Sequence, residues 1–164
     1  MPFRRTIWKY DERYRIDCLN LPSDQIEAIA RIQSIDAAKK RTPPIPVADA
    51  IKMFNLLEQV PKDCILNPKE FHQLVSKMDS WGAGIKTTVC IIAVMTDGRY
   101  PPLDKKIVHG ARIRGIITAE EEKVLNGANL RSISEVYINK LVPLWTRDVE
   151  RIRDPERVDK EWSS

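Results

Sequence analysis

The sequence predicts an all-α fold, a compact helical domain formed by one chain of 164 residues. Apolar residues recur at three- and four-residue spacing, helix-capping patterns precede several of these segments, and no segment shows a convincing alternation of apolar and polar residues. Hydrophobic residues make up 43% of the chain, which is enough for one continuous core. We therefore treat residues 1–164 as a single domain.

Two helices are predicted before residue 60, whereas residues 1–21 are left unassigned. Asp24 followed by Glu27 resembles a helix start, and the periodicity continues to about residue 40. The prolines of residues 42–46 break this helix, because proline lacks an amide N–H and restricts the residue before it. A second helix is expected at residues 47–59. The inward side chains are expected to be Ile26, Ile29, Ala30, Ile35, Ile51, Met53, Phe54 and Leu57.

The third and fourth helices form a pair joined by a glycine turn. Asn67 is a capping residue, Pro68 follows at the first helical position, and Glu70 is the acid three residues after the cap. This helix should end near Asp79, and a second apolar helix is expected at residues 85–95. The β-branched residues of that segment would also suit a strand by propensity, but the glycine turn before it favours a helix. The predicted inward face of the first helix is Phe71, Leu74, Val75 and Met78.

Four further helices are expected at residues 103–114, 118–127, 132–144 and 154–162. Thr118 with Glu121, and Ser132 with Glu135, form capping-box patterns that predict two of these starts. Pro143 is expected to kink the helix that contains it.

Composition permits a nucleic-acid ligand without identifying one. The net charge is +4 and the isoelectric point is near 9.0. Basic residues gather in one segment that holds a single carboxylate, Asp104. These residues are Arg99, Lys105, Lys106, Arg112 and Arg114.

No metal ion or other cofactor is expected. The three cysteines are widely spaced, and the two histidines are far from any second ligand in sequence, which argues against a disulfide framework, a zinc site or an iron–sulfur site. These five residues are Cys18, Cys64, Cys90, His72 and His109. The chain also shows neither a membrane span nor a signal peptide. We therefore expect no membrane association and a location in the cytoplasm, associated with the nucleoid, or in the nucleus, rather than secretion.

The segment most informative about function is the turn at Gly82 and Gly84. Two glycines one residue apart permit positive φ angles and the close approach of another backbone. The N–H groups at the start of the following helix can then bind a phosphate with the help of the helix dipole. On this hypothesis Gly82, Ala83, Gly84 and Ile85 contact DNA phosphates. An ordinary corner between two helices, with no ligand, would also contain such glycines.

Residues 67–114 as a whole resemble the helix-hairpin-helix DNA glycosylase superfamily, which includes endonuclease III and the 8-oxoguanine glycosylases. The family hairpin reads Leu-Pro-Gly-Val-Gly-x-Lys-Thr-Ala, and this chain has Ser80-Trp-Gly-Ala-Gly-Ile-Lys-Thr-Thr88. The family continues with Pro-x-x-Asp-x-x-Val, and this chain has Pro101-Pro-Leu-Asp-Lys-Lys-Ile107. Ser80 and Thr88 depart from the family residues, and only 66 residues precede the first helix of the hairpin unit, at about residues 67–97.

The resemblance implies an enzyme of base-excision repair, a DNA glycosylase with abasic-site lyase activity. Lys86 falls on the catalytic lysine, and Asp104, 18 positions later, falls on the catalytic aspartate. A neutral lysine can attack the sugar and form a Schiff base, and a carboxylate can stabilise positive charge on the sugar. The positive end of the helix dipole and partial burial would both favour the neutral amine of Lys86.

Each of these roles has a simpler alternative. Lys86 can be a phosphate contact and Asp104 a helix cap, while Lys105 and Lys106 contribute further phosphate contacts. Trp81 can face DNA or a flipped base, but an aromatic residue beside a turn more often packs into the core. Whether these residues are catalytic or only contact DNA, the expected partner is double-stranded DNA, which for the enzyme is damaged or abasic. The rival functions are a non-catalytic DNA-binding protein of a repair or defence assembly, and a helical protein-interaction module.

Overall fold

Seven α-helices and one π-helical turn make up the regular structure in the computed structural model, which describes residues 21–38 and 45–145. They are α3 (Ser23–Ala38), α4 (Val47–Glu58), α5 (Pro68–Asp79), α6 (Ile85–Met95), α7 (Lys105–Ile113), α8 (Ala119–Asn126), α9 (Leu130–Val136) and η1 (Tyr137–Leu141). No strand occurs in these two ranges, so the all-α prediction is confirmed there. Cys18 and the helix expected at residues 154–162 lie outside the described residues.

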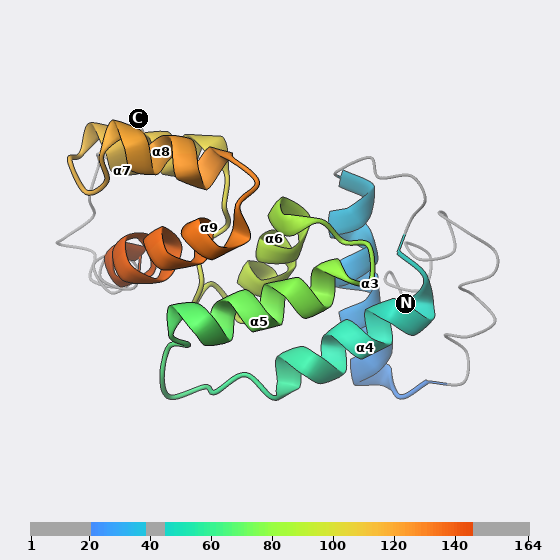
Figure 1. Ribbon diagram of the computed structural model, residues 1–164. Coiled ribbons are helices and arrows are strands. Elements are labelled where there is room, and N and C mark those ends of the chain that lie inside the picture. Colours follow the sequence, from blue (N-terminus) through green and yellow to red (C-terminus); the bar gives the residue numbers. More distant parts are fainter. Residues whose placement is uncertain (1–20, 39–44, 146–164) are drawn as a thin grey trace, which may run out of the picture.

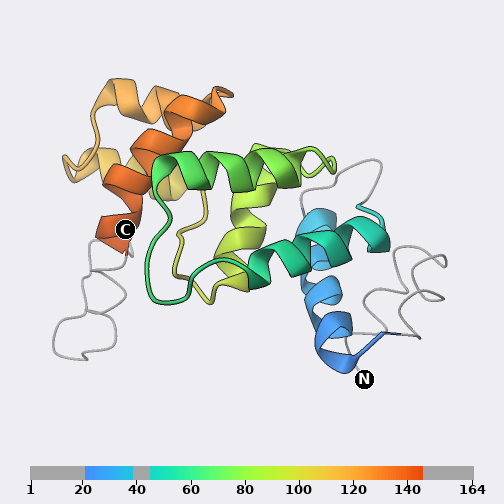
Figure 2. The ribbon, with the colours of Figure 1, turned by 60° about the horizontal axis from the view of Figure 1, so that its bottom comes forward.

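The pair α5 and α6 occupies the middle of the fold (Figure 1). Helices α3 and α4 pack together on one side, where α3 also contacts α6. Helices α7, α8 and α9 form a group on the other side, where α9 and η1 pack against α5 (Figure 2).

An aromatic cluster fixes α5 against the C-terminal group of helices. The ring of Phe71 stacks with the rings of Tyr100 and Tyr137, at centroid distances of 6.2 and 4.7 Å. The hydroxyl oxygen of Tyr100 accepts a hydrogen bond from the Leu66 N–H at 3.0 Å, and the Tyr137 hydroxyl donates to the carbonyl oxygen of Pro101. Both phenols are therefore buried with a hydrogen-bond partner, as polar groups in a core require.

The predicted inward faces are confirmed in α5, and in α3 and α4 the predicted residues are buried except Ile35, Ile51 and Phe54, which are partly buried and pack against the core. Phe71 and the other three predicted residues of α5 are buried. In α4, Met53 is fully buried, whereas Ile51 and Phe54 are only half-buried. Helix α3 begins at Ser23, so Asp24 lies inside the first turn instead of capping it.

The predicted start of α9 at Ser132 is wrong. The helix begins at Leu130, because the side chain of Asn129 accepts a hydrogen bond from the Ser132 N–H at 3.0 Å and caps the helix three residues before Ser132. Pro143 does not end the helix, which continues to residue 145. The same helical segment contains the π-helical turn η1, which ends at Leu141, two residues before the proline.

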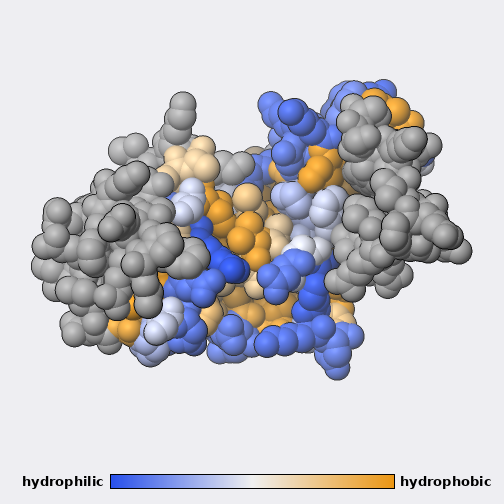
Figure 3. All heavy atoms as spheres, turned by 180° about the vertical axis from the view of Figure 1, so that it is seen from behind, coloured by the Kyte–Doolittle hydropathy of each residue, from blue (hydrophilic) through white to orange (hydrophobic). Residues whose placement is uncertain are grey.

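Hydrophobic side chains reach the surface on the face opposite to that of Figure 1, where they lie between hydrophilic ones (Figure 3). Among the described residues, the exposed large hydrophobic side chains are Ile65, Val94 and Ile113. No helix in the described ranges is both long and apolar enough to cross a membrane. The location of the protein in the cytoplasm or nucleus stays a prediction.

Candidate nucleic-acid interface

The turn between α5 and α6 has the backbone conformation that its glycines predict. Gly82 has a φ angle of 88° and Gly84 has one of 80°, and a residue with a side chain would be strained at these angles. The Gly82 N–H donates to the Asp79 carbonyl oxygen at 2.8 Å, which closes the turn at the end of α5. Gly82 is exposed, whereas the side chain of Ala83 is fully buried and anchors the tip of the turn in the core.

A carboxylate that the sequence reasoning did not single out stabilises this turn. One oxygen of Asp79 accepts a hydrogen bond from the Gly84 N–H at 3.0 Å. Aspartate side chains at helix ends and turns commonly accept bonds from nearby backbone N–H groups, so an aspartate three residues before Gly82 was a usable signal. The consequence is that a negative charge lies at the site proposed for phosphate contact, and the Gly84 N–H is already occupied.

The remaining N–H groups at the start of α6 have no side-chain cap among the described residues. Gly84 occupies the N-cap position and offers no acceptor, so the amides of Ile85, Lys86 and Thr87 lack partners within the helix. The side chain of Ile85 is half-buried and packs against the core. The backbone amides, and not the side chains of Ala83 and Ile85, are therefore the groups that could meet a phosphate.

Lys86 lies in the first turn of α6 and is half-buried. Its Nζ donates a hydrogen bond to the carbonyl oxygen of Leu125, in the last turn of α8. Burial lowers the pKa of the Lys86 amine from its usual value, and the ammonium of Lys105 lowers this pKa further. A larger fraction of this amine is therefore neutral than of an ordinary surface lysine at the same pH.

Asp104 is the N-cap of α7. Its Oδ1 accepts a hydrogen bond from the Lys106 N–H at 2.6 Å, and the residue is exposed. Lys105 and Lys106 form the exposed first turn of α7, and the charge of Lys105 acts on Lys86. The start of α7 therefore lies near Lys86, but no hydrogen bond or ion pair joins Lys86 to Asp104 in the part of the chain that the structure describes.

Trp81 is half-buried and packs against the hydrophobic core, as an aromatic residue beside a turn commonly does. The Nζ of Lys77 lies 5.5 Å from the centre of its ring. This contact places a cation beside the hairpin. A role for Trp81 in contacting DNA or a flipped base stays a prediction.

The partner of Lys86 was not foreseen from the sequence. Leu125 lies 39 positions after Lys86, and its backbone carbonyl carries no sequence signal. Among the described residues, no group of three or more His, Cys, Asp or Glu side chains could hold a metal ion.

Comparisons of this chain with protein-family models, with curated proteins and with solved structures found no significant match.

Proposed function

We propose that this protein is a DNA glycosylase with lyase activity at abasic sites, and that Lys86 is its nucleophile. The observation that carries the proposal is the half-buried Lys86 amine, two residues after Gly84, whose pKa is lowered by burial and by Lys105. A nucleophilic lysine needs a depressed pKa, because only the neutral amine has a free electron pair. The resemblance of residues 67–114 to the glycosylase superfamily supports the same role.

The proposed lyase reaction uses only the DNA and water. The Lys86 amine attacks the aldehyde carbon C1′ of the ring-opened abasic sugar, and loss of water gives a protonated imine. A water molecule then takes up a C2′ proton, the electron pair left behind forms the C2′–C3′ double bond as the C3′–O bond breaks, and the 3′-phosphate departs with the C3′–O bonding pair. Hydrolysis of the imine restores the amine.

Base removal would use the same amine and the carboxylate of Asp104. The amine displaces the base at C1′, and the base leaves with the bonding electron pair and takes up a proton. The Asp104 carboxylate, held by the Lys106 N–H, would stabilise positive charge that develops on the sugar. The N-terminal amides of α6, with Lys105 and Lys106, would bind the flanking phosphates.

Borohydride trapping tests the proposal directly. The reductant converts the imine into a stable amine, so wild-type protein and a duplex with one abasic site should give a covalent complex. Lys86→Arg keeps a cation and a hydrogen-bond donor for Leu125 but forms no such imine, so it should lose trapping and keep DNA binding within a few fold. Lys123→Ala, on an exposed lysine of α8, is the matched control and should trap normally. Equal trapping by Lys86→Arg and wild type would refute the proposal.

A non-catalytic DNA-binding protein is the second candidate, and the bond from Lys86 to Leu125 favours it. A cation near the C-terminal carbonyls of a helix is stabilised by the helix dipole, so this contact also suits a lysine that simply joins α6 to α8. On this alternative the wild type binds duplex DNA at low salt but gives no trapped complex. Failure to bind DNA at all would instead indicate a protein-interaction module.

A further inference from the structure

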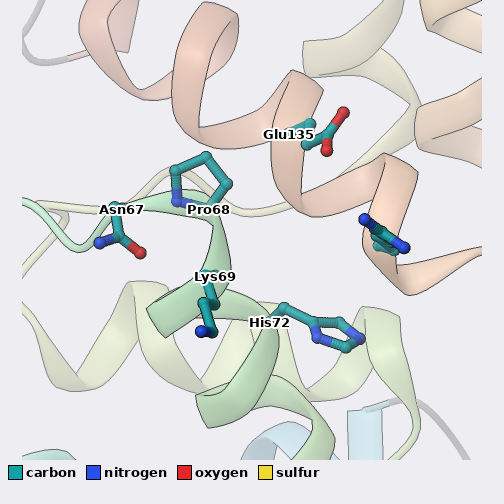
Figure 4. Close-up of a pocket in the computed structure, with 6 residues that line it drawn as sticks. Asn67, Pro68, Lys69, His72 and Glu135 are labelled. Atoms are coloured by element: carbon teal, nitrogen blue, oxygen red, sulfur yellow. The ribbon is translucent and has the colours of Figure 1, made fainter.

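Two neighbouring cavities follow the exposed side of α5. The first has a volume of about 630 Å³ and lies between the start of α5 and α9, where His72 and Glu135 come from the two facing helices (Figure 4). The second has a volume of about 370 Å³ and reaches Ser80, directly before the hairpin. His72 lines both cavities, and we name the two together the α5 groove.

The charged side chains of the α5 groove are mostly basic and mostly without partners. Lys69 and Arg131 are exposed and make no hydrogen bond or ion pair among the described residues, and neither does the single carboxylate, Glu135. Lys77 lines the second cavity and lies against the ring of Trp81. Basic side chains that no protein carboxylate neutralises leave the groove with an excess of positive charge.

The spacing of these cations suits a chain of phosphates better than a single anion. Lys69 and Lys77 are eight residues apart on one helix, or about 12 Å along its axis. A duplex rises about 3.4 Å per base pair along its axis, so this length corresponds to three or four base-pair steps. The second cavity also reaches Ser80, five residues before the first uncapped amide of α6, that of Ile85.

We propose that the α5 groove binds the phosphodiester backbone of the same DNA that contacts the hairpin. This inference rests on the proposed function, and it adds a second contact surface beyond the hairpin residues. The contacts are electrostatic and read no base sequence. They fix the direction in which the DNA leaves the hairpin, along α5 towards Arg131.

A pair of variants on one helix gives opposite expected results. Arg131 and Glu135 lie four positions apart on consecutive turns and carry opposite charges, and neither has a partner to lose. In fluorescence anisotropy with a 20-base-pair duplex, Arg131→Ala should weaken binding about eightfold at 0.1 M salt and lower the salt slope by about 0.9, the effect of one phosphate contact. Lys69→Ala should behave in the same way. Glu135→Gln should tighten binding, a result that damage to the fold would not produce.

The matched control is Lys52→Ala on α4, a helix that lines neither cavity, and it should leave the affinity unchanged. The inference fails if wild type binds the duplex and Lys69→Ala, Arg131→Ala and Glu135→Gln bind it equally well. In that case Lys86-dependent trapping still supports the proposed function. If wild type does not bind the duplex at all, the proposed function and this inference fail together.

Discussion

The hydroxyl of Thr88 is buried in α6 without a hydrogen-bond partner, and it offers a stability test of the hairpin unit. Thr88 has 0% exposure, and no donor or acceptor in the described structure reaches its Oγ1. A helical threonine often bonds the carbonyl four residues earlier, which here is Gly84, but that oxygen accepts only the Thr88 N–H, at 2.9 Å. Burying a hydroxyl without a partner costs about 1–3 kcal/mol.

Thr88→Val should therefore raise the free energy of unfolding by about 1–2 kcal/mol. Valine has nearly the same shape, so the core packing is kept, and the helix propensities of valine and threonine are similar. For a chain of this size, about 1 kcal/mol corresponds to roughly 2–4 °C in melting temperature. We expect a rise of about 2–8 °C in thermal unfolding followed by far-ultraviolet circular dichroism, with DNA binding unchanged.

Thr87 provides the matched control on the same helix turn. Thr87 is 6% exposed, and its hydroxyl oxygen is not one of the fully buried polar atoms that lack a hydrogen-bond partner. Thr87→Val should therefore change the free energy of unfolding by less than about 0.5 kcal/mol. A melting temperature of Thr88→Val at or below that of wild type would refute the reasoning, because it would mean that the hydroxyl is satisfied in the folded protein.

Three other variants test the candidate interface and the core. Lys105→Ala removes a positive charge near Lys86, so the pKa of Lys86 should rise. The pH profile of the borohydride-trapping rate should then move to higher pH, and an unchanged profile would contradict the role given to Lys105. Asp79→Asn keeps an acceptor for the Gly84 N–H but removes a negative charge. The affinity for duplex DNA, measured by anisotropy at low salt, should therefore rise roughly two- to fivefold. Asp79→Ala also removes the acceptor of the Gly84 N–H, so it should not gain affinity. Tyr137→Phe leaves the Pro101 carbonyl without its donor, so urea unfolding should show a loss of about 1–2 kcal/mol, and no loss would contradict the buried hydrogen bond.

Local chemistry allowed most helix boundaries to be predicted. The capping boxes at Asn67 and Thr118 are present with both of their reciprocal hydrogen bonds, and each satisfies backbone groups within a few residues of itself. The same rule failed at Ser132, because Asn129 competes for the same N–H group and starts the helix earlier. Two adjacent caps of similar strength cannot be ranked from sequence alone, since the packing of α9 on α5 decides between them.

The candidate site was predictable only where its determinants are local. The positive φ angles of Gly82 and Gly84 follow from the residues of the turn itself. The cap that Asp104 supplies to α7 likewise depends only on residues next to it in sequence. The environment of Lys86 depends on contacts between helices that are distant in sequence, namely the Leu125 carbonyl and the charge of Lys105. Periodicity and motif spacing contain no information about either contact.

Two helix ends have opposite effects on a positive charge at Lys86. The N-terminus of α6 disfavours a positive charge on its first turn, whereas the carbonyl of Leu125, at the C-terminus of α8, favours one. Burial and Lys105 act in the same direction as the α6 N-terminus, and the pKa of Lys86 is lowered. The Leu125 carbonyl of α8 and the charge of Lys105 on α7 therefore set the environment of this amine, and the glycine hairpin by itself does not. A neutral amine can still donate one hydrogen to Leu125 and keep its electron pair for a sugar carbon. The same contact can thus orient the nucleophile that we propose.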